Sequence, residues 1–85
     1  MTQEYLLLAF ESTHAAIAAQ KALSALGVIL IPTLRAITAS CGMSLRFALS
    51  ARQQALDILS AHGISGWTLY QVRQEGNRVL EVTPL

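Results

Sequence analysis

The sequence has 85 residues, which is enough for a single domain (1–85) and too few for a catalytic machine of several domains. Hydrophobic residues make up 53% of the chain and charged residues only 13%, so the composition predicts a folded chain rather than a disordered one. The net charge of +1 gives no electrostatic reason to expect nucleic acid as a partner. The single cysteine excludes an internal disulfide, a dithiol redox motif and a cysteine-rich zinc site.

No part of the sequence is apolar for long enough to cross a membrane as a helix, which takes roughly 18 residues. The most apolar stretch, 21–35, is interrupted by Gly27 and Pro32. The opening residues, MTQE, lack the positive charge with which a secretory signal peptide begins, and a lone cysteine suits a reducing compartment. We therefore expect a cytoplasmic protein without a membrane partner.

The first part of the chain predicts a central strand and a helix. The run YLLLAF at 5–10 is too short for a helix and is apolar on both faces, which is typical of a central strand. Ser12 or Thr13 can cap a helix that reaches Leu26 and ends at Gly27. One face of this helix is apolar and consists of Ala15, Ala16, Ala19, Ala22, Leu23 and Leu26.

Two further strands are predicted on either side of a long connection. The first covers 28–31 and ends at Pro32, and the second covers 43–49, where large apolar residues alternate with small or polar ones. Between them lies the connection TLRAITASCG at 33–42, which is longer than the other connections of the chain. Long irregular segments on a rigid scaffold often carry function.

The rest of the chain predicts a second helix and a hairpin. The residues SARQ at 50–53 have the pattern of a capping box, and the helix that they open ends at Gly63. Strands at 67–72 and 78–82 are joined by a turn at 75–77. The core face of the second helix is expected to consist of Ala51, Ala55, Ile58, Leu59 and His62.

The element order β-α-β-β-α-β predicts an α+β fold, a ferredoxin-like two-layer sandwich with a C-terminal β-hairpin extension. A right-handed crossover places the third strand between the first two. The same topology brings the end of the first strand, the start of the first helix, the long connection and the end of the second helix to one edge of the sheet. Cys41 is therefore expected at the same end of the domain as His14.

Cys41 lies among small residues of the long connection, so little steric cover is expected over its sulfur. Gly42 allows a turn that directs backbone amides at an anion. Ser40 and Ser44 supply hydroxyl donors, and Arg35 supplies a permanent positive charge. These features favour the thiolate, which is the nucleophilic form of cysteine. The alternative interpretation is a buried, inert cysteine that is present for its size.

The other titratable residues are weaker candidates. His14 could shuttle a proton for Cys41, although a plain surface position is the stronger interpretation. His62 falls on an apolar helix face, which favours a structural role. Because neither histidine has a second ligand at helical spacing, no metal site is predicted, and nothing indicates a cofactor. Arg35 could equally be a solvated charge or form an ion pair with Glu11.

The apolar strands also predict association between copies of the chain. The runs YLLLAF and VILIP leave few polar positions, and in a two-layer fold the helices cover one face of the sheet. We therefore expect a homo-oligomer that forms through the open sheet face or an edge strand.

The residues around Cys41 carry a resemblance to a known family. The chain has an apolar first strand, the residues STHAA at 12–16, and IPTLRAITASCG at 31–42. With these motifs it resembles the small bacterial selenium/sulfur carrier protein-like family. The tripeptide SCG, with an upstream proline and arginine, is the specific part. Leu34 stands where the family usually has a second proline, and Met43 where leucine is common.

The resemblance implies a thiol that accepts sulfur or selenium and hands it on. By that likeness Cys41 is the carrier residue, with Arg35, Ser40 and Gly42 around it, and its partners are donor and acceptor proteins for sulfur or selenium. A persulfide carrier needs one accessible thiol and no second cysteine that would discharge it as a disulfide. The single cysteine of this chain meets the second condition.

Two other functions stay open. One is a non-catalytic binding or regulatory module of the ferredoxin-like type that acts through dimerisation. The other is an enzyme with Cys41 as its nucleophile and His14 as its base, which is less favoured because 85 residues do not easily enclose a deep pocket. We expect a carrier or accessory protein rather than an enzyme with turnover.

Overall fold

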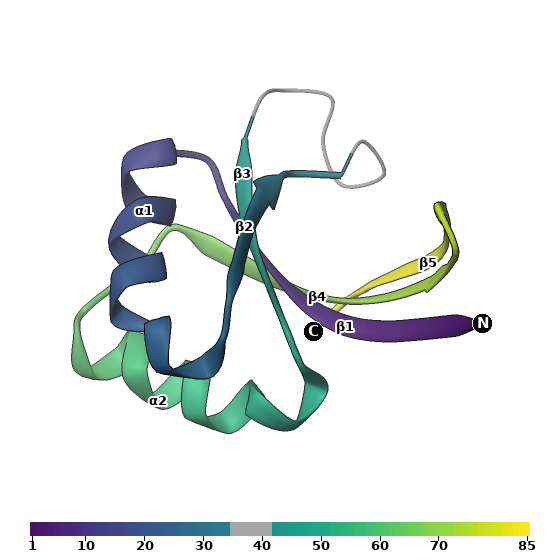
Figure 1. The fold of residues 1–85 in the computed structure, drawn as a ribbon. Helices are drawn as coiled ribbons and strands as arrows, with labels where there is room; N and C mark the ends of the chain where they lie inside the picture. Colours follow the sequence, from purple (N-terminus) through teal and green to yellow (C-terminus); the bar gives the residue numbers. More distant parts are fainter. Residues whose placement is uncertain (35–41) are drawn as a thin grey trace.

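The computed structural model describes residues 1–34 and 42–85, which form one sheet and two helices (Figure 1). This arrangement confirms the α+β class. Two short 3₁₀ helices, Ser24–Leu26 and Leu49–Ala51, follow the first helix and precede the second. The strands and α-helices are β1 (Thr2–Phe10), α1 (Thr13–Ala22), β2 (Ile29–Pro32), β3 (Met43–Phe47), α2 (Arg52–Ala61), β4 (Trp67–Glu75) and β5 (Arg78–Pro84).

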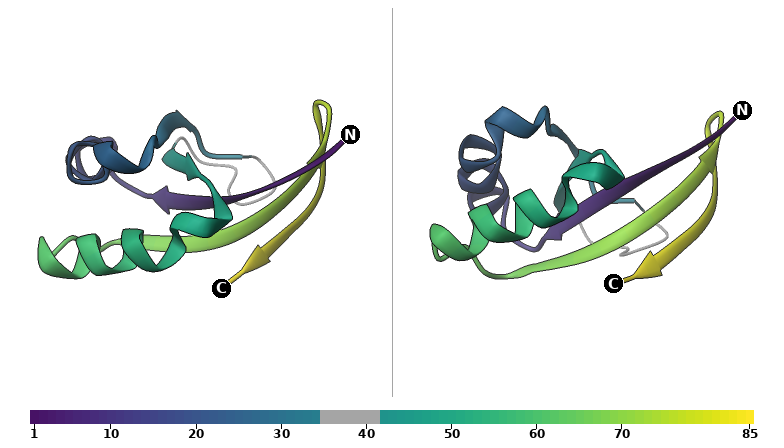
Figure 2. Two further views of the ribbon diagram at one scale, coloured as in Figure 1. Left: turned by 60° about the horizontal axis from the view of Figure 1, so that its bottom comes forward. Right: turned by 90° about the horizontal axis from the view of Figure 1, so that it is seen from below.

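The sheet is antiparallel and has the strand order β2-β3-β1-β4-β5. The third strand lies between the first two, as the crossover rule predicts. The predicted C-terminal hairpin is also present, and β5 extends the sheet at one edge. Figure 2 shows β1 (purple) and β4 (light green) curving together toward the turn that joins β4 to β5. The central strand β1 pairs with β4 along its whole length, from Thr2 opposite Glu75 to Phe10 opposite Trp67.

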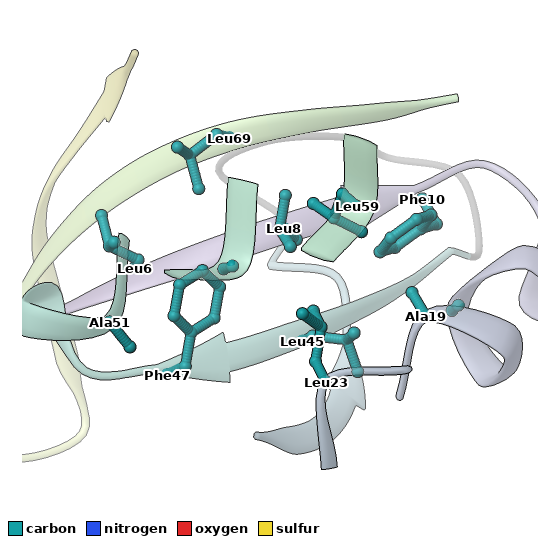
Figure 3. Packing of buried hydrophobic residues seen from close by; sticks show 12 residues of the cluster. Leu6, Leu8, Phe10, Ala19, Leu23, Leu45, Phe47, Ala51, Leu59 and Leu69 are labelled. Carbon is teal, nitrogen blue, oxygen red and sulfur yellow. The ribbon is translucent and has the colours of Figure 1, made fainter. Parts of the chain in front are cut away.

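Both helices cover the same face of the sheet (Figure 1). Successive strand residues point to opposite faces, so Leu6, Leu8 and Phe10 of β1 all face the helices. The small side chains of Ala16 and Ala19 let α1 lie close to the sheet. Figure 3 shows this main core, whose buried residues are Leu6, Leu8, Phe10, Ala16, Ala19, Leu23, Leu45, Phe47, Ala51, Ala55, Leu59 and Leu69.

The other face of the sheet carries a second cluster of buried side chains. Tyr5, Leu7 and Val72 are 4%, 0% and 0% exposed, respectively. The partly buried residues packed against them are Ile31, Leu34, Tyr70, Val79 and Val82. The prediction that the strand at 5–10 is buried on both faces is therefore confirmed, while the three residues at 2–4 that extend β1 are exposed. The face that was expected to be open is filled at its centre by side chains of the chain itself.

The first helix is shorter than predicted, although its cap is confirmed. The Ser12 side chain accepts a hydrogen bond from the backbone N–H of Ala15, at 3.3 Å. The α-helix ends at Ala22 rather than at Leu26, and one 3₁₀ turn then leads to Gly27. Gly27 has a φ of 68°, the left-handed conformation that glycine adopts without strain.

The second helix departs from its prediction at both ends. Its N-cap is Ala51, no side chain caps it, and the predicted capping box at 50–53 is not formed. A 3₁₀ turn at Leu49–Ala51 occupies that place instead. The predicted core face was right for Ala51, Ala55 and Leu59 and for the partly buried Ile58, but His62 is exposed. His62 is the C-cap, where the backbone has left the helical path (φ −93°, ψ 1°), so the helical period no longer applies.

Candidate functional site

The elements that flank the long connection meet at one edge of the sheet, where β1 and β2 end and β3 and β4 begin. Phe10, the last residue of β1, lies opposite Met43 of β3 and Trp67 of β4. Pro32, the last residue of β2, also lies opposite Met43. The chain then turns from Phe10 into α1, which is capped by Ser12. The ends of β1 and β2 and the starts of β3, β4 and α1 thus lie at one edge of the sheet, as predicted, whereas Cys41 lies outside the described residues.

Gly42 is the described residue that follows Cys41, and it is held tightly at this edge. Its carbonyl oxygen accepts a hydrogen bond from the backbone N–H of Thr33, at 2.9 Å. A Cβ atom at Gly42 would lie 3.0 Å from the carbonyl oxygen of Phe10 and 3.2 Å from Oγ1 of Thr33. Glycine therefore allows the backbone to approach β1 closely, and any larger residue would force its neighbours to move.

Ser44 is fully buried in β3, and its hydroxyl contacts Thr33. The two oxygen atoms, Ser44 Oγ and Thr33 Oγ1, are 2.7 Å apart, which is a hydrogen bond in which either hydroxyl can donate. The sequence predicts Ser44 as a hydroxyl donor beside the thiol. The structure gives this hydroxyl a partner at the base of the long connection, because buried hydroxyl groups are stable only when they are hydrogen-bonded.

Leu34 shows on which side of the sheet the connection begins. Its side chain is partly buried and packs against the second cluster, on the face away from the helices. This residue stands where the resembling family usually has proline. The entry to the connection is therefore supported by apolar packing, in a chain that lacks the φ restraint of a second proline.

Three predicted site residues, Arg35, Ser40 and Cys41, lie outside the described residues. Their proposed contributions to a stabilised thiolate therefore stay predictions. Within the described ranges, Gly42 and Ser44 come together through Thr33, the first residue of the predicted connection at 33–42. The contact of Thr33 with Gly42 follows from the pairing register of β2 with β3, because Pro32 opposite Met43 places Thr33 opposite Gly42.

The two histidines are both exposed. His14 is the second residue of α1 and lies near the edge at which Gly42 rejoins the sheet. His62 lies at the end of α2. Among the residues that the structure describes, no three His, Cys, Asp or Glu side chains are grouped as a metal site would require.

A separate polar cluster lies on the face away from the helices. The Arg46 guanidinium stacks over the Tyr5 ring, 4.0 Å from its centre, and donates a hydrogen bond to Gln3 at 3.1 Å. The Tyr5 hydroxyl donates to Gln74 at 2.7 Å. Burial raises the pKa of the Tyr5 phenol above 10.0, and the positive charge of Arg46 opposes that rise.

Neither of the two described α-helices could cross a membrane, since each has 10 residues and a spanning helix needs roughly 18.

Comparison with models of protein families gives one match, which covers most of the chain. The model described as "Putative Se/S carrier protein-like" matches residues 5–71. The chain belongs to this family. The match runs from β1 into β4 and includes Thr33, Gly42, Ser44 and the segment with Cys41, whereas β5 lies outside it. No curated protein and no solved structure matches the chain significantly.

Proposed function

We propose that this protein carries sulfur or selenium on the thiol of Cys41. The observation that carries the proposal is the family match, which spans the segment with the only cysteine of the chain. The hydrogen bond from Thr33 to Gly42 supports it, because this bond closes the segment 33–42 at the edge of a rigid sheet. A reactive group on a segment with fixed ends is suited to presenting one atom to partner proteins.

The proposed transfer needs no oxidant or reductant. The Cys41 thiolate attacks the outer sulfur of a donor persulfide, R–S–SH, and forms a new S–S bond. The original S–S bond breaks, and its electron pair leaves with the donor thiolate. The acceptor thiolate later attacks the outer sulfur on Cys41 in the same way and regenerates the Cys41 thiolate. A selenium atom in the outer position follows the same electron count.

The surrounding residues have proposed roles in stabilising the thiolate. Arg35 supplies positive charge, Ser40 supplies a hydroxyl donor, and Gly42 permits the turn next to the sulfur. His14, which is exposed on the first turn of α1, is proposed as a supporting proton shuttle. The buried Ser44 acts through Thr33 at the base of the segment.

We further infer that β2, β3, β1 and β4 form a ferredoxin-like unit with α1 and α2, to which β5 is added. The position of β3 between β1 and β2, and of β4 on the other side of β1, supports this inference. The partners proposed for this unit are donor and acceptor proteins for sulfur or selenium. A second copy of the chain is proposed at an edge strand, where Ile29 of β2 is 57% exposed.

A binding module that acts through dimerisation is the competing function. It would use the sheet face away from the helices, yet Leu7 and Val72 at the centre of that face are buried by the chain itself. The carrier proposal and this alternative differ in their dependence on Cys41, because a binding module does not require the thiol.

The deciding experiment is mass spectrometry after incubation with a low-molecular-weight persulfide. The wild type is expected to gain one sulfur atom, and Cys41→Ser none. Addition of a reducing thiol should remove the gained sulfur as hydrogen sulfide or pass it to the added thiol. An unmodified wild-type protein, or a Cys41→Ser variant that gains as much sulfur, would show that Cys41 is not a carrier.

A further inference from the structure

We propose that two copies of this chain associate through β2, and that their β2 strands pair antiparallel about Leu30. The inference rests on the second copy included in the proposed function, and it is independent of sulfur transfer by Cys41. The strand order β2-β3-β1-β4-β5 gives the sheet two edges, β2 and β5. A strand at an edge presents backbone N–H and C=O groups with which another strand can pair.

The register of β2 shows which of its backbone groups point away from β3. Opposite residues of an antiparallel pair alternate between hydrogen-bonded and non-hydrogen-bonded positions. The N–H of Thr33 donates to the Gly42 carbonyl, one step beyond the last pair of the register, so this position is hydrogen-bonded. The backbone groups of Leu30 and Pro32 therefore point to the free edge, where proline offers only a carbonyl because it lacks an N–H.

These groups match those of a second β2 strand. When Leu30 lies opposite itself across a two-fold axis, its N–H and C=O bond with the C=O and N–H of the second copy. The N–H of Val28 can then donate to the Pro32 carbonyl of the other copy, in both directions. The pairing requires no donor from either proline, and a two-fold contact closes at the dimer.

The same register brings apolar side chains together. Ile29 lies opposite Ile31 of the second copy at a non-hydrogen-bonded position, where side chains approach most closely. In the single chain Ile29 is 57% exposed, and Ile31 packs against the second cluster on the face away from the helices. The pairing therefore covers Ile29 and joins the second clusters of the two copies into one apolar layer.

The other edge is protected against such pairing. β5 carries the exposed charges of Arg78 and Glu81, and its register with β4 shifts between Arg73 and Gln74. Charges and irregularities of this kind block pairing at natural sheet edges. By contrast, β2 (29–32) contains no charged residue and pairs with β3 in a continuous register. The edge that accepts a second strand is therefore β2.

Sedimentation equilibrium of the full chain tests which edge is used. The wild type is expected to show a concentration-dependent equilibrium between monomer and dimer. Ile29→Lys should raise the dimer dissociation constant by about tenfold or more, because it places an ammonium group from each copy in the apolar contact. Leu80→Lys is the matched control, since Leu80 is a 42% exposed residue of β5, and it should leave the constant unchanged.

Disulfide cross-linking tests the register. In the Cys41→Ser background, Ile29→Cys and Ile31→Cys proteins are mixed and treated with a mild oxidant. Opposite residues at a non-hydrogen-bonded position have Cα atoms about 4.5 Å apart, which a disulfide can span. The disulfide between positions 29 and 31 should therefore form well above its statistical share. A statistical mixture of the three products would overturn the register.

The outcomes separate this inference from the carrier function. A wild type that stays monomeric at millimolar concentration, or equal weakening by Ile29→Lys and Leu80→Lys, would overturn the pairing through β2 even if the protein gains sulfur. Species that keep growing beyond the dimer would also overturn it, because they indicate pairing of β2 with β5. A dimeric wild type that gains no sulfur would overturn the carrier function alone.

Discussion

At the scale of single residues, the two ends of the segment 33–42 are held together by residues whose size and hydrogen bonds fit the space between the strands. Gly42 fits because it has no Cβ to collide with the Phe10 carbonyl. Thr33 and Ser44 satisfy one another in a place that excludes solvent from Ser44. A sequence shows that these residues are small or hydroxylated, whereas their mutual contacts follow from the pairing of β2 with β3.

The ionisation of Tyr5 gives a prediction at the same scale. Arg46 favours the charged phenolate, so Arg46→Met should raise the already elevated pKa of Tyr5 further. Because the unfolded chain ionises first, Tyr5 lowers the free energy of unfolding as the pH rises above 10.0 and through its folded pKa, and has no such effect at lower pH.

Absorbance titration of tyrosinate measures this effect. The variant Tyr70→Phe serves as the background, since it leaves Tyr5 as the one tyrosine of the chain. A Tyr5 pKa that falls or stays constant in Arg46→Met would contradict the stacking of the guanidinium on the phenol ring.

At the scale of elements, the two helices begin by different means. Ser12 caps α1 with its side chain, whereas α2 grows from a 3₁₀ turn and has no side-chain cap. The residues at 50–53 have the composition of a capping box, but Ser50 lies inside the 3₁₀ turn Leu49–Ala51, and Ala51 takes the N-cap position instead. Composition identifies a possible cap, and the path of the chain into the helix decides whether it forms.

Two serine substitutions test this difference. Ser12→Ala should lower the free energy of unfolding by about 1 kcal/mol, since the hydrogen bond to the Ala15 N–H is lost. Ser50→Ala should change it by less than about 0.5 kcal/mol, because Ser50 is exposed and caps nothing. Urea unfolding of both variants provides the measurement, and equal effects would contradict the assigned caps.

At the scale of the whole molecule, the sheet has a core on each face. The helices cover one face, and side chains from β2, β4, β5 and Leu34 surround the buried residues of the other. β1 and β4, which carry the buried residues of this second cluster, curve together toward the turn between β4 and β5 (Figure 2). The chain thereby buries apolar residues that a flat two-layer sandwich would leave for a partner.

This second core predicts a large effect of truncation at Leu7. Leu7→Ala should lower the free energy of unfolding by about 2–5 kcal/mol, as expected for a fully buried leucine. Ile29→Ala, at an exposed position on the same face, should have a much smaller effect on unfolding. Urea unfolding of the two variants decides the matter, and a mild effect of Leu7→Ala would show that the face away from the helices is not a core.

Hydrophobic periodicity was enough to predict the order of strands and helices along the chain, the burial of the strand at 5–10 on both faces and the C-terminal hairpin. The single cysteine identified the one candidate thiol, and the residues next to it made Gly42 and Ser44 candidates for the same site. Periodicity reports which residues of an element share a face, but it does not report which other element covers that face. For this reason only the tertiary structure revealed the second core, the exposure of His62 and the pairing of Thr33 with Ser44.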